Sequence, residues 1–229
     1  MSDTERITYD TSWGRRLPAR IGRAILLMGI LKPLIWLHVR PRVHGRERLE
    51  GVEGPVLIAA NHASHLDTPV IMQSLPRALR RRTGVVAAAD YFFNKRLTGW
   101  FVTVAFATLP IERKNLSPLT HQRIEQMLSD GWSMLVYPEG TRTKTGKLQR
   151  LKSGTAHFAI GYGLPIVPVY LTGTYESHGK GSKWPTPHRV TVRFGAPIPP
   201  PADGDHRALT DRLREALVAL AAESGRAEP

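Results

Sequence analysis

The sequence predicts a single-domain α/β fold, in which a central mixed sheet is flanked by helices and an amphipathic helical element precedes the sheet. Two observations support this fold class. Short apolar runs typical of buried strands alternate along the chain with segments of helical periodicity. The chain also has 229 residues, of which 41% are hydrophobic, so it can bury one sizeable core and is not expected to be disordered.

Each predicted strand is a short apolar run bounded by a glycine, a proline or a polar loop. The runs are GPVLIAA (54–60), GVVAAAD (84–90), SMLVYP (133–138), LPIVPVYL (164–171) and HRVTVRFG (188–195). Among the helices, Ser117 followed by Pro118 predicts a helix start, because the hydroxyl caps a free backbone N–H and proline suits the first turn. The last helix has leucines at helical spacing, with Asp203 or Asp205 near its start.

The charge of the chain is positive and concentrated near the N-terminus. Lysine and arginine number 32 against 19 acidic residues, a formal net charge of +13. A charge of this size indicates an anionic partner, such as a nucleic acid, an anionic membrane surface or a phosphorylated substrate. From residue 15 to residue 48 the only acid is Glu47. The basic residues of this stretch are Arg15, Arg16, Arg20, Arg23, Lys32, Arg40, Arg42, Arg46 and Arg48.

An apolar run that contains Trp36 is interleaved with these charges, at 24–39 (AILLMGILKPLIWLHV). We expect the run to be too short to span a bilayer comfortably and to be split at Lys32-Pro33. Basic residues beside an apolar helix predict an element that lies in the membrane interface, although a helix packed on the domain's own core is the alternative. We therefore divide the chain into a basic amphipathic membrane-docking segment (1–40) and an α/β domain (41–229).

Two histidines and an aspartate, His62, His65 and Asp67, follow the first predicted strand. A zinc site is one interpretation, but Ala63 stands where the zincin pattern needs a glutamate, and the chain has no cysteine. Alternatively, Asp67 in the first turn of the next helix orients His62, whose other ring nitrogen takes a proton from a hydroxyl. No G-x-S-x-G turn supplies a serine, so that hydroxyl would belong to a substrate. In the simplest interpretation, Asp67 only caps a helix.

A basic loop follows the third predicted strand, with five basic residues and no acid from Arg142 to Lys152. Gly140 permits close backbone approach, and Arg142 offers a bidentate fork to a phosphate. A nucleotide-binding P-loop requires G-x-x-x-x-G-K-[ST], whereas Gly140 and Gly146 are one residue too far apart and Leu148 replaces the hydroxyl residue. A phosphate-binding loop and an ordinary solvated loop both remain open.

Four short blocks together resemble the glycerolipid acyltransferase family, whose best-known members are the lysophosphatidic acid acyltransferases. In chain order they are NHASHLD (61–67), LPIERKN (109–115), YPEGTRT (137–143) and LPIVPVYL (164–171). The first matches the H-x-x-x-x-D block of the family, and the matching span runs from about residue 55 to 174. One departure is Tyr137, where the family usually has phenylalanine.

The resemblance implies an O-acyltransferase of phospholipid synthesis. His62 would be the general base, Asp67 would orient it, and His65 would be a structural bystander. The acyl donor would be acyl-CoA or acyl-carrier protein, with no cofactor and no metal. The residues that would bind the phosphate-bearing acceptor are Arg113, Glu139, Gly140, Thr141 and Arg142.

The resemblance also implies where the protein works and on what. The acceptor would be lysophosphatidic acid or a related lyso-lipid, with glycerol 3-phosphate or a lyso-ornithine lipid as alternatives. We expect a peripheral or monotopic protein on the cytoplasmic face of a membrane. Two other classes compete: a phosphotransferase that uses the loop 140–147, and a basic nucleic-acid binder, for which neither a helix-turn-helix nor an aromatic stacking platform is evident. We expect no nucleic-acid partner.

Overall fold

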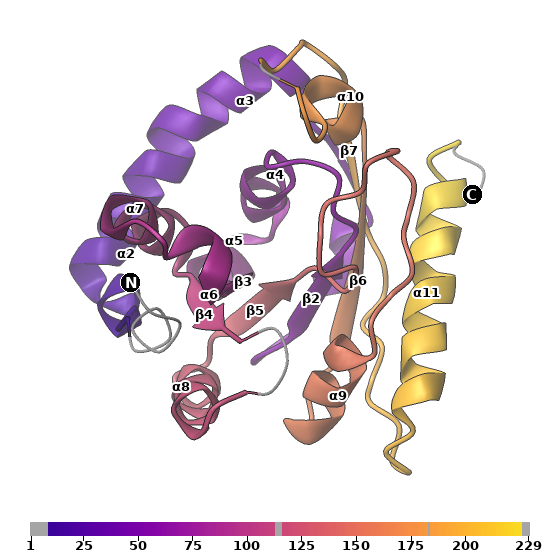
Figure 1. The fold of residues 1–229 in the computed structure, drawn as a ribbon. Coiled ribbons are helices and arrows are strands. Elements are labelled where there is room, and N and C mark those ends of the chain that lie inside the picture. Colours follow the sequence, from indigo (N-terminus) through magenta and orange to yellow (C-terminus); the bar gives the residue numbers. More distant parts are fainter. Residues whose placement is uncertain (1–8, 113–115, 183, 226–229) are drawn as a thin grey trace.

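The computed structural model describes residues 9–112, 116–182 and 184–225. Within them the chain forms a seven-stranded sheet with the strand order β1-β7-β6-β2-β5-β3-β4 (Figure 1). β6 and β7 are antiparallel, and every other neighbouring pair is parallel, so the predicted mixed sheet is confirmed. The strands are β1 (Arg42–His44), β2 (Leu57–Ala60), β3 (Thr83–Ala88), β4 (Leu109–Ile111), β5 (Ser133–Val136), β6 (Ile166–Thr172) and β7 (Thr191–Phe194).

Helices cover both faces of the sheet (Figure 1). β2 is buried on both faces, as expected for a central strand with parallel neighbours. Its side chains alternate between two cores: Ile58 packs with α4 and α5, whereas Leu57 packs with α8, α9 and α11. The helices are α2 (Leu17–Ala24), α3 (Lys32–Val39), α4 (Asp67–Ser74), α5 (Arg77–Arg81), α6 (Ala89–Phe92), α7 (Arg96–Phe106), α8 (Pro118–Ser129), α9 (Gly154–Gly161), α10 (Thr174–His178) and α11 (His206–Ala222), with short 3-10 turns η1 (Ser12–Arg15) and η3 (Arg46–Leu49).

Two predicted helix starts are confirmed by their caps. The Ser117 hydroxyl accepts a hydrogen bond from the backbone N–H of Thr120, directly before Pro118 begins α8. Asp205, one of the two candidates for the last helix, accepts from the N–H groups of Arg207 and Ala208 at the start of α11. Both caps satisfy backbone donors that have no partner inside the helix.

The N-terminal helix is continuous from Leu17 to Val39, so the prediction that it splits at Lys32-Pro33 is wrong. α2 and α3 are joined by a π-wound segment, η2 (Ile25–Leu31), in which the Lys32 N–H bonds to the carbonyl of Leu27, five residues back. A proline removes one N–H and crowds the preceding turn, and the wider π turn accommodates that change without ending the helix.

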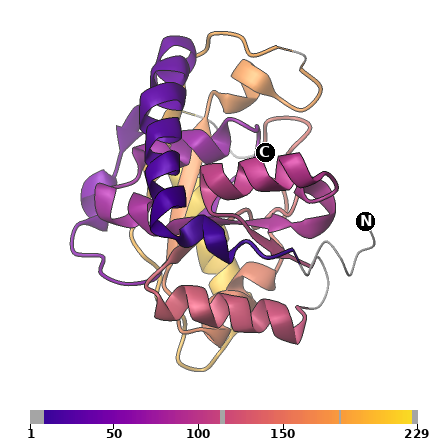
Figure 2. The same cartoon turned by 90° about the vertical axis from the view of Figure 1, so that its left-hand side faces the viewer.

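The same helix is longer than the apolar run suggested. It has 23 residues and contains an 18-residue window with a mean hydropathy of 1.4, so by length and composition alone it could cross a membrane. Only 17% of its most apolar window is buried against the rest of the protein. The N-terminal helix runs beside α4 and α7 on the outside of the molecule (Figures 1 and 2).

Candidate active site

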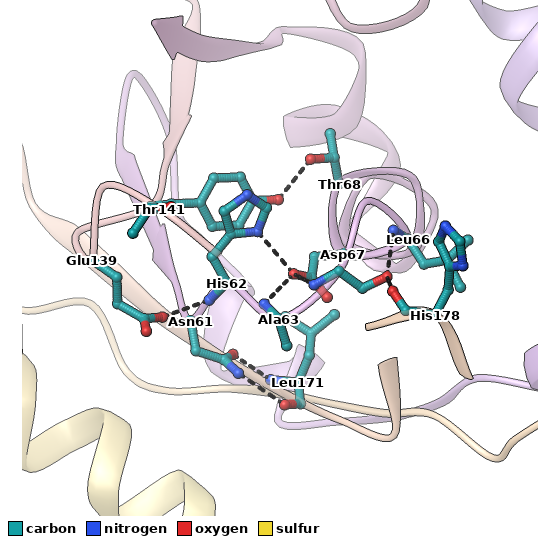
Figure 3. A network of polar contacts seen from close by, with 12 residues as sticks. Asn61, His62, Ala63, Leu66, Asp67, Thr68, Glu139, Thr141, Leu171 and His178 are labelled. Atoms are coloured by element: carbon teal, nitrogen blue, oxygen red, sulfur yellow. Dashed lines mark hydrogen bonds and ion pairs between the residues drawn. The ribbon is translucent and has the colours of Figure 1, made fainter. Parts of the chain in front are cut away.

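The site begins where β2 ends, between β5 and β6. Ala60 is the last β2 residue, and it pairs with Val169 of β6. The next residue, Asn61, is buried, and its side chain continues the pairing: Nδ2 donates to the Leu171 carbonyl over 3.0 Å, and Oδ1 accepts from the Leu171 N–H over 2.8 Å. This bridge fixes the backbone as the chain leaves the sheet, and it therefore fixes the position of His62 (Figure 3).

The predicted contact between His62 and Asp67 is confirmed. Nδ1 of His62 lies 2.9 Å from Oδ2 of Asp67, the first residue of α4. The N–H groups of Ala63 and Ser64 donate to the same oxygen, over 2.7 Å and 2.8 Å. Asp67 is fully buried, whereas 18% of the His62 side chain is exposed. Because the carboxylate oxygen accepts these bonds, Nδ1 carries the ring proton and Nε2 keeps its lone pair.

Tyr137 holds the His62 ring from its face. The two ring centroids are 3.8 Å apart and the ring planes are inclined by 16°, so the rings are stacked. The Tyr137 hydroxyl lies 2.7 Å from Oγ1 of Thr68 in the first turn of α4. Burial raises the pKa of the Tyr137 phenol well above its usual range, and the negative charge of Asp67 adds to that rise. The phenol is therefore a neutral anchor for the imidazole ring.

Glu139 joins the loop after β5 to the backbone of His62. It is only 3% exposed, and Oε1 accepts from the His62 N–H over 2.6 Å. Oε2 accepts from the backbone N–H and the side-chain amide of Gln149, over 2.9 Å and 3.1 Å. Burial raises the pKa of the Glu139 carboxyl, and these hydrogen bonds oppose the rise. Both oxygens are thus occupied from within the chain.

The remaining loop residues follow Glu139 in the chain. Gly140 has φ +73° and follows a turn in which its N–H bonds to the Tyr137 carbonyl. A Cβ at this position would lie 2.8 Å from Nζ of Lys152 and would have to displace the end of that side chain, so the left-handed conformation is the main reason for a glycine here. Thr141 is exposed, and the Thr143 N–H bonds to the His62 carbonyl over 2.8 Å. The loop therefore runs directly past His62.

Of the two predicted phosphate-binding arginines, Arg142 lies among the described residues. Arg142 is half-buried, and it lies close enough to His65 for its charge to act on that ring. The pKa of His65 is lowered to about 4, first by partial desolvation and then by the charge of Arg142. His65 is thus neutral at pH 7. Arg113 lies outside the described residues.

The arrangement can accept a proton from a hydroxyl that approaches Nε2 of His62. Among the described residues, the only hydrogen bond to the His62 ring is the one at Nδ1. Within residues 9–112, 116–182 and 184–225, no group of three histidine, aspartate or glutamate side chains is placed so that it could hold a metal ion. An imidazole oriented by a carboxylate can transfer a proton, and this one lies at the carboxyl end of a parallel strand, where α/β sheets bind their ligands.

The chain is therefore an α/β protein with an H-x-x-x-x-D site directly after a central strand of its sheet. A family model described as "Acyltransferase" matches residues 40–172. The chain belongs to this family.

Curated relatives point to one branch of the family. A 1-acyl-sn-glycerol-3-phosphate acyltransferase of Limnanthes douglasii is 30% identical over 169 residues, which cover 72% of this chain and 57% of the relative. One of Cocos nucifera is 33% identical over 60% of this chain and 44% of its own length. The alpha form of Bos taurus is 27% identical over 87% of this chain and 70% of its own length. This chain spans about half the length of the first two.

One solved structure has the same fold. It is the crystal structure of the 1-acyl-sn-glycerophosphate (LPA) acyltransferase PlsC from Thermotoga maritima, with a TM-score of 0.73. The alignment covers 97% of this chain and 86% of that chain at 22% identity. At this identity the likeness concerns the fold alone.

Proposed function

We propose that the protein is an O-acyltransferase that transfers a fatty acyl group to the free hydroxyl of lysophosphatidic acid or a related lyso-lipid. The observation that carries the proposal is the His62–Asp67 pair, in which Nδ1 is bonded at 2.9 Å and 18% of the His62 side chain is exposed. Membership of the Acyltransferase family supports the reaction class. The names of the curated relatives support the choice of acceptor.

In the proposed reaction, Nε2 of His62 removes the proton from the acceptor hydroxyl as its oxygen attacks the thioester carbonyl of the donor. The carbon–sulfur bond breaks, and the imidazolium returns the proton to the leaving thiolate, so the enzyme ends unchanged. Asp67 stabilises the imidazolium through the hydrogen bond at Nδ1. General base catalysis of this kind contributes about 100- to 10,000-fold, and no acyl-enzyme is needed because the acceptor supplies the nucleophile.

We place the phosphate of the acceptor at the loop that follows β5. Arg142 supplies a guanidinium whose fork matches phosphate oxygens, and Thr141 is exposed beside it. Arg113 is assigned to the same phosphate by family resemblance alone. Glu139 acts differently in this proposal: its two oxygens are occupied by His62 and Gln149, so it positions the loop and leaves the acceptor to its neighbours.

We propose that the protein works at a membrane surface on the cytoplasmic side, with acyl-CoA or acyl-carrier protein as the donor. The net charge of +13 favours an anionic membrane and an anionic donor. The long N-terminal helix, which is mostly unburied, gives the protein an apolar element for that surface. No cofactor is required by the proposed chemistry.

The test is product formation by the purified protein. Labelled acyl-CoA or acyl-carrier protein is supplied with lysophosphatidic acid, glycerol 3-phosphate or a lyso-ornithine lipid in separate reactions. The proposal expects phosphatidic acid from lysophosphatidic acid at the highest rate. A preference for one of the other acceptors would change the substrate but keep the reaction class, and no acyl transfer with any donor and acceptor would refute the proposal.

A further inference from the structure

Exposed apolar side chains are strongly clustered on one part of the molecule. Thirteen large hydrophobic side chains are exposed among the described residues, and ten of them belong to the N-terminal helix or to α7. Single exposed apolar residues are normal on soluble proteins, whereas a contiguous group marks an interaction surface. The seven on the N-terminal helix are Leu17, Ile21, Ile25, Ile30, Leu34, Trp36 and Leu37.

The three on α7, which we call the α7 patch, are Leu97, Trp100 and Phe101, exposed by 83%, 53% and 48%. They stand at positions i, i+3 and i+4, so they share one face of the helix. The opposite face buries small residues, among them Gly99 and Ala105. A helix that packs on a soluble core puts its large apolar side chains inward; α7 does so with Val102 and Phe106 but also exposes three large apolar side chains on its other face.

At Gly99 the inner face of α7 has no room for a larger side chain. A Cβ on Gly99 would lie 2.8 Å from Cδ1 of Phe93, which is itself buried. Gly99 therefore lets this turn of α7 lie close to the domain, while Leu97, Trp100 and Phe101 remain outside. This distribution suits a helix with two apolar environments, the protein on one side and a second apolar phase on the other.

α7 and the N-terminal helix pack directly against each other, so their exposed apolar residues lie on neighbouring elements. The rings of Trp13, just before α2, and Trp100 are stacked with centroids 6.4 Å apart. The buried guanidinium of Arg23 in α2 donates to the Thr103 carbonyl of α7 over 3.2 Å, which fastens the two helices together. Both helices lie on the face turned toward the viewer in Figure 2.

The charge around this surface identifies its partner. The sequence has no aspartate or glutamate from residue 11 to 46 or from 91 to 111. Exposed cations border both helices: Arg16 before α2, and Lys95 and Arg96 at the start of α7. An apolar face with tryptophan, on helices that carry cations and no acidic residue, matches a bilayer with anionic headgroups, in which tryptophan lies at headgroup level and each cation adds attraction.

We propose that the α7 patch is a second membrane contact, which lies in the bilayer interface beside the N-terminal helix. Two contacts in different elements fix the orientation of the protein on the membrane, whereas a protein held by one helix could still rotate about the axis of that helix. The inference rests on the membrane association proposed above. It is tested by vesicle binding without any acyl donor, so its outcome does not depend on the proposed reaction.

The experiment measures sedimentation of the full chain with vesicles of about three parts phosphatidylcholine to one part phosphatidylglycerol. The double variant Leu97→Glu/Trp100→Glu should bind about ten-fold more weakly than wild type. The control Trp184→Glu adds one negative charge, at a tryptophan exposed by 81% outside both helices, and it should bind within about two-fold of wild type. It is matched in charge to the single variant Leu97→Glu, which should bind about three-fold more weakly than wild type. Pure phosphatidylcholine vesicles should bind the wild type more weakly, which isolates the charge contribution.

Two outcomes would overturn the inference: wild-type binding by the double variant, or an equal loss in the Trp184→Glu control. If the double variant melts well below wild type, the single variant Leu97→Glu replaces it, because a side chain exposed by 83% contributes little packing. That variant should lose binding by about three-fold, and wild-type binding would again contradict the α7 contact.

Discussion

Replacing Asp67 with asparagine removes a negative charge at the centre of the site and leaves the shape of the side chain almost unchanged. Three N–H groups, from the ring of His62 and the backbone of Ala63 and Ser64, converge on Oδ2. The other oxygen, Oδ1, is buried with no hydrogen-bond partner among the described residues. An asparagine must therefore either bury its NH2 group without an acceptor or turn it toward three donors.

The expected magnitudes follow from that geometry. A buried polar group left unpaired costs about 1–3 kcal/mol of folding free energy, so the melting temperature of Asp67→Asn should fall by about 3–10 °C. The effect on rate is larger, because the amide cannot stabilise an imidazolium. A hydrogen bond to a charged group contributes about 1.5–3 kcal/mol, and loss of the correct tautomer adds to this, so kcat should fall by about 100-fold or more.

The assay is the initial rate of acyl transfer to lysophosphatidic acid, with thermal melting measured on the same samples. Asp205→Asn is the matched control, because Asp205 also accepts two backbone N–H bonds at a helix start but belongs to α11, outside the site. Asparagine is an equally good cap, so this control should keep the rate within about two-fold. If folded Asp67→Asn retains more than a third of the wild-type kcat, Asp67 does not support His62 in the way proposed.

Three further predictions concern the support around the site. The pKa of Glu139 is raised, so the folded state holds the Glu139 proton more tightly than the unfolded chain does, and the free energy of unfolding falls as the pH rises from the ordinary pKa of a glutamate through the folded pKa. Glu139→Gln should remove this pH dependence in urea unfolding measured across that range. An unchanged pH dependence would contradict the assignment. Tyr137→Phe keeps the stack and should retain kcat within about three-fold, whereas Tyr137→Leu should lose about 3- to 10-fold in kcat with KM nearly unchanged, and equal rates for the two variants would show that stacking has no role. Gly140→Ala puts a side chain on a residue in the left-handed region, so the protein should lose about 1–2 kcal/mol of stability. Adding Lys152→Ala to this variant should restore only the part of the stability that is lost to the contact with the lysine. Full recovery of stability would mean that the backbone conformation is unstrained.

The sequence predicted the elements whose causes are local. The cap at Ser117 and the proline after it determine the start of α8, and the apolar runs at 54–60 and 164–171 became β2 and β6. The contact between His62 and Asp67 was also within reach, because a short bend joins a strand end to a helix start. The helix across Pro33 was missed because its continuity depends on π winding, for which the sequence carries no simple signal.

The support of the site was not predicted, because it joins residues far apart in the chain. Asn61 bridges to Leu171, Tyr137 covers His62, and Glu139 binds the His62 backbone across 77 positions. These contacts follow from the parallel pairing of β2 with β5 and β6, which no local pattern reveals. One clue was available: the tyrosine that begins the third block, where the family usually has phenylalanine, adds a hydroxyl that must find a partner if it is buried.

The central claim is that His62 removes the proton from the acceptor hydroxyl. The most direct test is the initial rate of phosphatidic acid formation by His62→Ala and wild type, at equal enzyme and with both proteins bound to the same vesicles. The account predicts that the variant folds and binds vesicles like the wild type but forms product at least about 100-fold more slowly. Equal rates in the two proteins would contradict it.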